Sequence, residues 1–128
     1  MSYTSVNILD YTFQAYGDLR SNQYHCVEMA ASNVVQICSA TTAVMCGVLQ
    51  NNPNSGESAV VRLIGISKAK TAEALYQGWA VGTAANGALD PKTIGTDTTH
   101  YVIGNVLENA SSGDIGMVLI DGTPVRGA

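Results

Sequence analysis

The sequence predicts an all-β protein, a single small β-sandwich or barrel of the jelly-roll or β-tulip type. Charged residues make up 12% of the 128 residues, about half of the ~25% usual in globular domains, and Lys and Glu are scarce. Thr, Ser, Asn, Val and Gly (13 residues) are abundant instead. Short β-branched stretches alternate with turn residues at roughly the 8–12-residue spacing of sandwiches and barrels. A chain of this length buries a sizeable core in one domain.

Residues 1–20 are predicted to form an extended N-terminal arm. Four of the eight aromatic residues lie within the first sixteen positions, where apolar and polar residues are interleaved without helical spacing. Apolar side chains exposed on such an arm indicate contact with another protein. The interface residues predicted on this basis are Tyr3, Val6, Ile8, Leu9, Tyr11, Phe13 and Tyr16. An ordinary first strand is the alternative for the same segment.

Residues 21–122 have the pattern of a β-domain, and residues 123–128 are predicted to form a C-terminal tail. Strands are predicted at 23–29, 33–39, 42–49, 58–66, 79–81, 101–107 and 115–120. The run NNPNSG at 51–56 predicts a turn, because its residues adopt turn dihedrals easily or bond their own backbone. The Asn-Gly pair at 86–87 is a strong hairpin signal.

The segment 67–76, SKAKTAEALY, departs from the strand pattern. Good helix formers dominate it, and Ala69, Ala72 and Leu75 follow helical spacing, which allows a helix of two turns. A strand followed by a turn is the alternative that we favour. The prediction is therefore at most one short helix, near 67–76.

Two parts of the chain repeat one another. GVLQN at 47–51 is followed by SGE at 55–57 and an apolar strand, and NVLEN at 105–109 is followed by SGD at 112–114 and another apolar strand. The repeat predicts two similar hairpins in one domain. A solenoid needs at least about three repeats, so that class is excluded.

No motif in the sequence predicts catalysis or a cofactor. GxSxG, the P-loop and GxGxxG are absent, and the ten carboxylates are scattered. Cys26, Cys38 and Cys46 form no CxxC pair. Of the two histidines, His25 and His100, the first is adjacent to Cys26 and on a strand would point to the opposite face, which disfavours a zinc site. We therefore predict no enzyme, no cofactor, no metal, and three buried free thiols.

Charge and hydropathy also limit the partners. A net charge of −4 with six Lys and Arg residues cannot neutralise many phosphates, so nucleic-acid binding is not expected. No stretch of 18 apolar residues exists to span a membrane. The first residues lack the basic and apolar regions of a signal peptide, so we expect synthesis in a cytoplasm. A surface so poor in charge suits a protein that contacts other protein.

Three segments together resemble the small capsid cement (decoration) proteins of tailed bacteriophages. They are GVLQNNPNSGESAVVRLIG at 47–65, ALYQGWAVGTAANGAL at 74–89, and YVIGNVLENASSGDIGMVLIDG at 101–122. Each motif contains turn glycines and apolar strands, and the likeness lies in their order and spacing over roughly 60% of the chain. The first 45 residues match less well.

The resemblance implies a non-catalytic virion protein on the outer surface of the phage head, made in the host cytoplasm. Such proteins stabilise the head by bridging neighbouring major capsid proteins. They do so as homotrimers on local threefold axes or as dimers on twofold axes, and the trimer is favoured here. The expected partners are thus the major capsid protein and further copies of the chain.

Other functions remain open at this point. A carbohydrate-binding module would use Tyr76, Trp79 and Tyr101 as a stacking face. Another β-structural module of the virion, in a tail, neck or adhesion structure, fits the same composition. A small enzyme would be built around Cys26 or Cys46 and would need a thiol of lowered pKa.

Overall fold

The all-β class is confirmed. The computed structural model describes residues 8–127, and these contain nine strands and no helix. The strands are β1 (Leu9–Ala15), β2 (Cys26–Ala31), β3 (Val34–Ile37), β4 (Met45–Leu49), β5 (Ser58–Lys70), β6 (Ala80–Thr83), β7 (Leu89–Pro91), β8 (Tyr101–Val106) and β9 (Ile115–Arg126).

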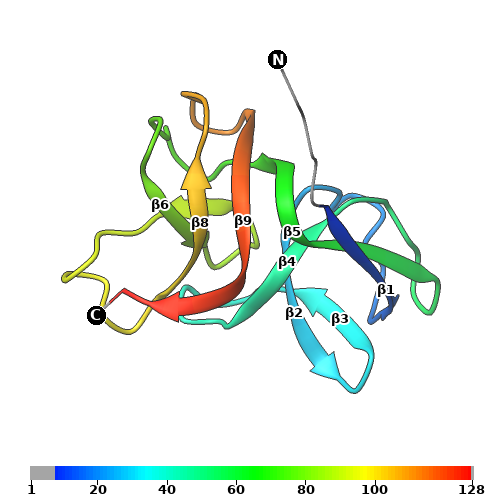
Figure 1. The fold of residues 1–128 in the computed structure, drawn as a ribbon. Helices are drawn as coiled ribbons and strands as arrows, with labels where there is room; N and C mark the ends of the chain where they lie inside the picture. The colour runs from blue at the N-terminus through cyan, green and yellow to red at the C-terminus, as the bar shows by residue number, and fades with distance from the viewer. Residues whose placement is uncertain (1–7, 128) are drawn as a thin grey trace, which may run out of the picture.

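The first five strands form a closed barrel. β1 pairs antiparallel with β5 and parallel with β3, and the order β1-β3-β2-β4-β5 returns to β1. Closure leaves no free edge in this part of the chain, and free edges are sites where other strands pair. The barrel lies on the right in Figure 1.

The last four strands form a second sheet with the end of β5, in the order β5-β9-β8-β6-β7. Within β5, Ile64 is the last partner of β1 and Gly65 is the first partner of β9. Gly65 has φ of 120°, a conformation that side chains rarely adopt. One strand of 13 residues therefore belongs to both sheets, and Figure 1 shows it passing between them.

Two hydrophobic cores share β2 and β4 as a common wall. Neighbouring residues on a strand point to opposite faces, so Val27 and Leu49 fill the barrel, whereas Cys26 and Val48 face the second sheet. All four side chains are fully buried. The barrel core holds Ala15, Leu19, Val27, Val35, Leu49, Ala59 and Val61. Besides Cys26 and Val48, the second core holds Cys38, Met45, Ala69, Leu75, Val81, Leu89, Ile103, Val106, Val118 and Ile120.

The strand-then-turn alternative for residues 67–76 is confirmed. Residues 67–70 are the end of β5, and Thr71 and Leu75 form single bridges to other segments. Ser67, Ala69 and Thr71 are buried, whereas the residues between them are more exposed. Pairing with β9 imposes this alternation of two, which prevails over the local preference for helix.

The ends of the chain differ from the predicted arm and tail. Residues 9–15 form β1, which closes the barrel, so the alternative of a first strand describes them. Residues 1–7 of the predicted arm, with Tyr3 and Val6, lie outside the described residues. At the other end, β9 continues to Arg126 by backbone pairing with β8, through most of the predicted tail.

The repeat seen in the sequence corresponds to two similar hairpins, as predicted. β4 and β5 form one, and β8 and β9 form the other. Turns at 54–57 and 111–114 precede the second strands, and each is closed by a backbone hydrogen bond of 3.0 Å between its first and last residues. Gly56 and Gly113 take φ of 81° and 84° at the third position, which explains the glycine in both copies.

The contact between β8 and β9 requires glycine at position 104. A Cβ there would lie 1.8 Å from the Leu119 backbone oxygen, so the two strands would have to separate. We expect Gly104→Ala to lower the free energy of unfolding by about 2–3 kcal/mol in urea titrations. Gly116→Ala is the matched control in β9, because its Cβ would meet only side-chain atoms, at 3.2 and 3.4 Å. Equal urea midpoints for the two variants would contradict this explanation.

Candidate interaction surface

The beginning of the described chain exposes large apolar side chains. Ile8, Leu9, Tyr11 and Tyr16 are between 44 and 65% exposed. Phe13 is different, because it is half-buried and packs against the barrel core, with its ring 4.8 Å from that of Tyr11. Of the seven predicted interface residues, these four are accessible and Phe13 is half-buried. The other two, Tyr3 and Val6, lie outside the described residues.

An apolar band continues from β1 onto the second sheet. Leu9 pairs with Ile64, and Ile66, two residues further along β5, pairs with Leu119 of β9. These four residues, which we call the apolar band, are each at least 37% exposed. Local sequence patterns do not single out Ile64, Ile66 or Leu119, because apolar alternation does not tell which face of a strand is covered. The pairing register of β5 with β1 and β9 is what brings these residues next to Leu9.

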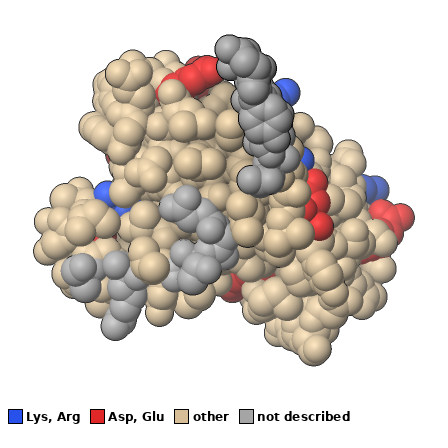
Figure 2. All heavy atoms as spheres, in the orientation of Figure 1, with Lys and Arg blue, Asp and Glu red and all other residues tan. Residues whose placement is uncertain are grey.

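Charged side chains are few among the described residues on the face of the molecule seen in Figure 2. The described side chains in this view are mostly uncharged, and acidic and basic ones appear only at a few separate places. Exposed apolar area without intervening charge is typical of surfaces that contact other proteins.

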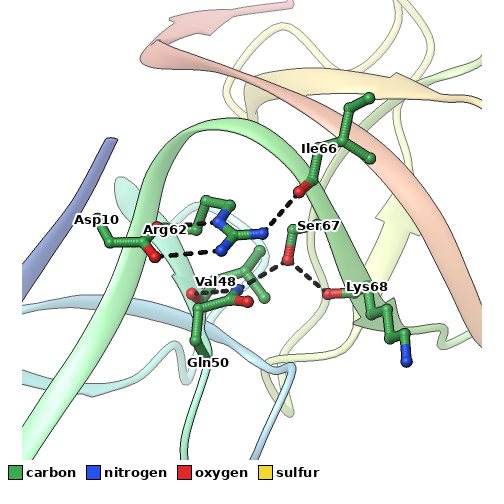
Figure 3. A network of polar contacts seen from close by, with 7 residues as sticks. All are labelled: Asp10, Val48, Gln50, Arg62, Ile66, Ser67 and Lys68. Carbon is green, nitrogen blue, oxygen red and sulfur yellow. Dashed lines mark hydrogen bonds and ion pairs between the residues drawn. The ribbon is translucent and has the colours of Figure 1, made fainter. Parts of the chain in front are cut away.

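An ion pair fastens β1 to β5 next to the apolar band. The Arg62 guanidinium donates to both carboxylate oxygens of Asp10, at 2.9 and 3.1 Å, and its remaining nitrogen donates to the Ile66 carbonyl oxygen at 2.8 Å. The bond to Asp10 raises the pKa of Arg62 further above its usual value. Arg62 therefore links β1 to both halves of β5 across Gly65 (Figure 3).

A second set of hydrogen bonds stabilises the part of β5 that follows Gly65. The Gln50 amide nitrogen donates to the Val48 carbonyl oxygen at 3.1 Å and to the Ser67 hydroxyl at 2.8 Å. The Ser67 hydroxyl in turn donates to the Lys68 carbonyl oxygen (Figure 3). These bonds fix the end of β4 against the part of β5 that enters the second sheet.

A buried lysine lies near the junction of β7 and β8. The Lys92 side chain is fully buried, and its ammonium is 3.2 Å from Asp90 and 3.0 Å from Nδ1 of His100. Because an ammonium has only donors, Nδ1 of His100 accepts this bond. A hydrogen bond with Asp90 raises the pKa of Glu73 nearby. The groups are arranged as a structural ion-pair network.

The cysteines are unsuited to nucleophilic catalysis. Burial raises the pKa of Cys26 to about 12 and that of Cys46 to about 11, and it also raises the pKa of Cys38. A catalytic thiol needs the opposite shift. Among residues 8–127 no cluster of three or more His, Cys, Asp or Glu side chains is placed to hold a metal ion. That part of the chain also has no helix of the length and hydropathy needed to cross a membrane.

The predicted aromatic stacking face is only partly assembled. Tyr76 and Trp79 lie together, with ring centroids 4.8 Å apart and planes at 65°. Trp79 borders a cavity, but Tyr101 is not among the residues that line it. Tyr101 instead begins β8, opposite Arg126.

The ion pair between Asp10 and Arg62 should control how firmly β1 is held. We expect Asp10→Ala to speed amide hydrogen exchange in residues 11–14 of β1 while β9 stays protected, with a stability loss of about 1 kcal/mol. The control is Asp18→Ala, since Asp18 also pairs with an arginine, Arg20, but both side chains are at least half exposed. Unchanged exchange in β1 would show that strand pairing alone holds it.

The raised thiol pKa values predict slow alkylation. In the folded protein at pH 8 all three thiols stay protonated, so iodoacetamide should label them far more slowly than in urea. Labelling should accelerate as the pH rises towards about 11, with Cys46 modified before Cys26. Mass spectrometry of the labelled peptides measures the order. Rapid labelling of a single thiol at pH 7 would reopen the hypothesis of a thiol enzyme.

Comparisons with known proteins agree with the fold. The chain has no match among curated proteins. In the crystal structure of the head fiber gp8.5 N base in bacteriophage phi29, a chain of 15% identity has the same fold, with a TM-score of 0.63 over 94% of this chain and 99% of that one. A family model described as phage cement protein matches residues 4–121, nearly the whole sequence. This chain therefore belongs to the phage cement protein family, a family of structural proteins of the virion.

Proposed function

We propose that the protein binds the outer surface of a phage head and stabilises it by bridging neighbouring major capsid proteins. Family membership supports a role at the capsid. The observation that carries the proposal is the exposure of Leu9 and Tyr11 on a strand that Asp10 and Arg62 hold in place, and of Ile8 directly before it. A surface that is both apolar and rigid loses little conformational entropy on binding.

In this mechanism β1 and the apolar band contact the shell. Burial of each exposed aliphatic side chain contributes about 25 cal/mol per Å² of apolar area removed from water. Tyr3 and Val6 precede β1 in the sequence and are proposed to extend the same contact. Many copies on one head would add their effects, so each interface can be modest in strength.

The second proposed partner is the chain itself. We favour a homotrimer, with a dimer as the alternative, because cement proteins act at symmetry axes of the shell. Synthesis in the host cytoplasm, followed by binding to the head, fits the free thiols. The raised thiol pKa values support a role without catalysis.

A second candidate function is a different structural module of the virion. The likeness to the N base of a phi29 head fiber favours it, because the chain in that crystal structure shares the fold over nearly its whole length. In this case the chain would act as the attachment domain of a larger appendage. Binding to shells is expected of both candidates, whereas stabilisation of the shell is expected only of a cement protein.

The test uses purified shells that lack the protein. We expect the wild-type chain to co-sediment with them and to raise the temperature at which they open. The double variant Leu9→Ser, Tyr11→Ser should bind at least tenfold more weakly, since two exposed apolar contacts are lost. Removal of residues 1–16 is unsuitable, because it would also remove β1 and open the barrel.

The control variant is Val44→Ser, which changes a side chain that is 51% exposed and belongs neither to β1 nor to the apolar band. It should bind as the wild type does. If the double variant keeps its full affinity while circular dichroism shows it folded, β1 is not the contact. Light scattering on the free protein gives its mass, and a monomer at all concentrations would refute the proposed oligomer.

A further inference from the structure

A cavity of about 560 Å³ lies where β6 begins, facing the loop between β7 and β8. This volume is typical of pockets that hold small molecules. Trp79, Pro91 and Ile94 form apolar parts of its lining, and Thr93 and Asn105 contribute polar groups. None of these residues belongs to the apolar band.

Trp79 provides a flat apolar wall that is held in place. Its backbone oxygen accepts a hydrogen bond from Val106 at 2.9 Å, and its backbone nitrogen donates to Tyr76 at 3.1 Å. The Tyr76 ring packs edge-on against the indole, at 4.8 Å between centroids. The indole nevertheless remains accessible, since Trp79 is 44% exposed. A ligand can therefore stack on it without first ordering the side chain.

Two polar side chains of the lining have free capacity for hydrogen bonds. Asn105 donates from its amide nitrogen to the Gly78 carbonyl oxygen at 3.4 Å. Its amide oxygen and the Thr93 hydroxyl have no partner among the residues that the structure describes. The Thr93 backbone nitrogen is bonded to Asp97 at 2.6 Å, which fixes the loop at this point. Hydrogen-bond donors and acceptors of Asn105 and Thr93 thus lie in the same cavity as the Trp79 ring.

The pocket presents no free charge. Lys92 is the one charged residue of its lining, and its ammonium is fully buried in the pairing with Asp90 and His100. A phosphate or carboxylate ligand would find no cation to pair with here. A ligand suited to this pocket is therefore neutral, with apolar faces and hydroxyl groups at its edge.

We propose that the pocket binds a neutral saccharide, with one pyranose ring stacked on Trp79. The carbon-bound hydrogens of one sugar face would pack on the indole, and the hydroxyls would bond to Asn105 and Thr93. This is a second function, separate from binding to the shell, and it rests on other residues. It would give the virion a weak affinity for glycans, strengthened by the number of copies.

The test exploits Trp79, which is the single tryptophan of the chain. Its fluorescence is recorded while lactose, maltotriose or chitotriose is added to the full chain. We expect a saturable change with at least one of these probes, with a Kd on the order of 1 mM. Glucose 6-phosphate serves as the charged probe and should bind at least tenfold more weakly. No saturable change with any neutral probe up to about 100 mM, a hundredfold excess over that Kd, would overturn the proposal.

Variants then assign the binding to the pocket, measured by ligand-observed NMR or calorimetry. Trp79→Ala and Asn105→Ala should each raise the Kd at least tenfold, whereas Tyr16→Ala, which removes an exposed aromatic ring elsewhere, should leave it unchanged. Circular dichroism checks that each variant is folded. Equal saccharide binding by Trp79→Ala would overturn the proposal.

Binding to shells separates this proposal from the cement function. If Trp79→Ala binds shells as tightly as the wild type, the pocket and the shell contact are independent, as proposed. If that variant loses shell binding and the wild type binds no saccharide, the pocket is a contact with the capsid protein and the saccharide proposal is wrong. Failure of the wild type to bind shells would affect only the proposed cement function.

Discussion

The molecule depends on one strand that serves two sheets. β5 pairs with β1 and β4 through its first half and with β9 through its second half. The change takes place at Gly65, whose φ of 120° suits a residue without a side chain. Arg62 bonds to Asp10 on one side of this glycine and to the Ile66 carbonyl oxygen on the other. Barrel closure and the position of the second sheet are thereby coupled.

This coupling explains how a compact protein of this family can present an apolar surface without losing its fold. The two cores are filled from opposite faces of β2 and β4, and the residues of the apolar band belong to neither core. Exposed residues such as Leu9, Ile66 and Leu119 are then free to serve contact with other proteins. The small number of charged side chains among the described residues in view in Figure 2 suits the same contact.

Local patterns predicted the elements of the fold better than its closure. The alternation of apolar and polar residues predicted the strands of both hairpins. The sequence Ser-Gly followed by an acidic residue predicted both turns, in which the glycine has a positive φ. Of the seven residues predicted for the interface from aromatic content and from apolar residues interleaved with polar ones, four are exposed in the structure. Phe13 differs from these four in being half-buried, because it packs against a barrel core whose members include Val27, Leu49 and Val61, which are distant in the sequence. No local pattern reports such contacts.

The sequence by itself determined the all-β class, the turns and the absence of a recognisable catalytic motif, because these follow from composition and from the conformations of neighbouring residues. Tertiary structure decided which segments belong together. Pairing with β5 made residues 9–15 a barrel strand, and pairing with β9 made residues 67–70 extended. The tertiary structure also pairs Leu9 with Ile64 and places Trp79 and Asn105 in the lining of one cavity. The reason is physical, since backbone pairing and burial act between residues that are distant in the chain and prevail over local preferences.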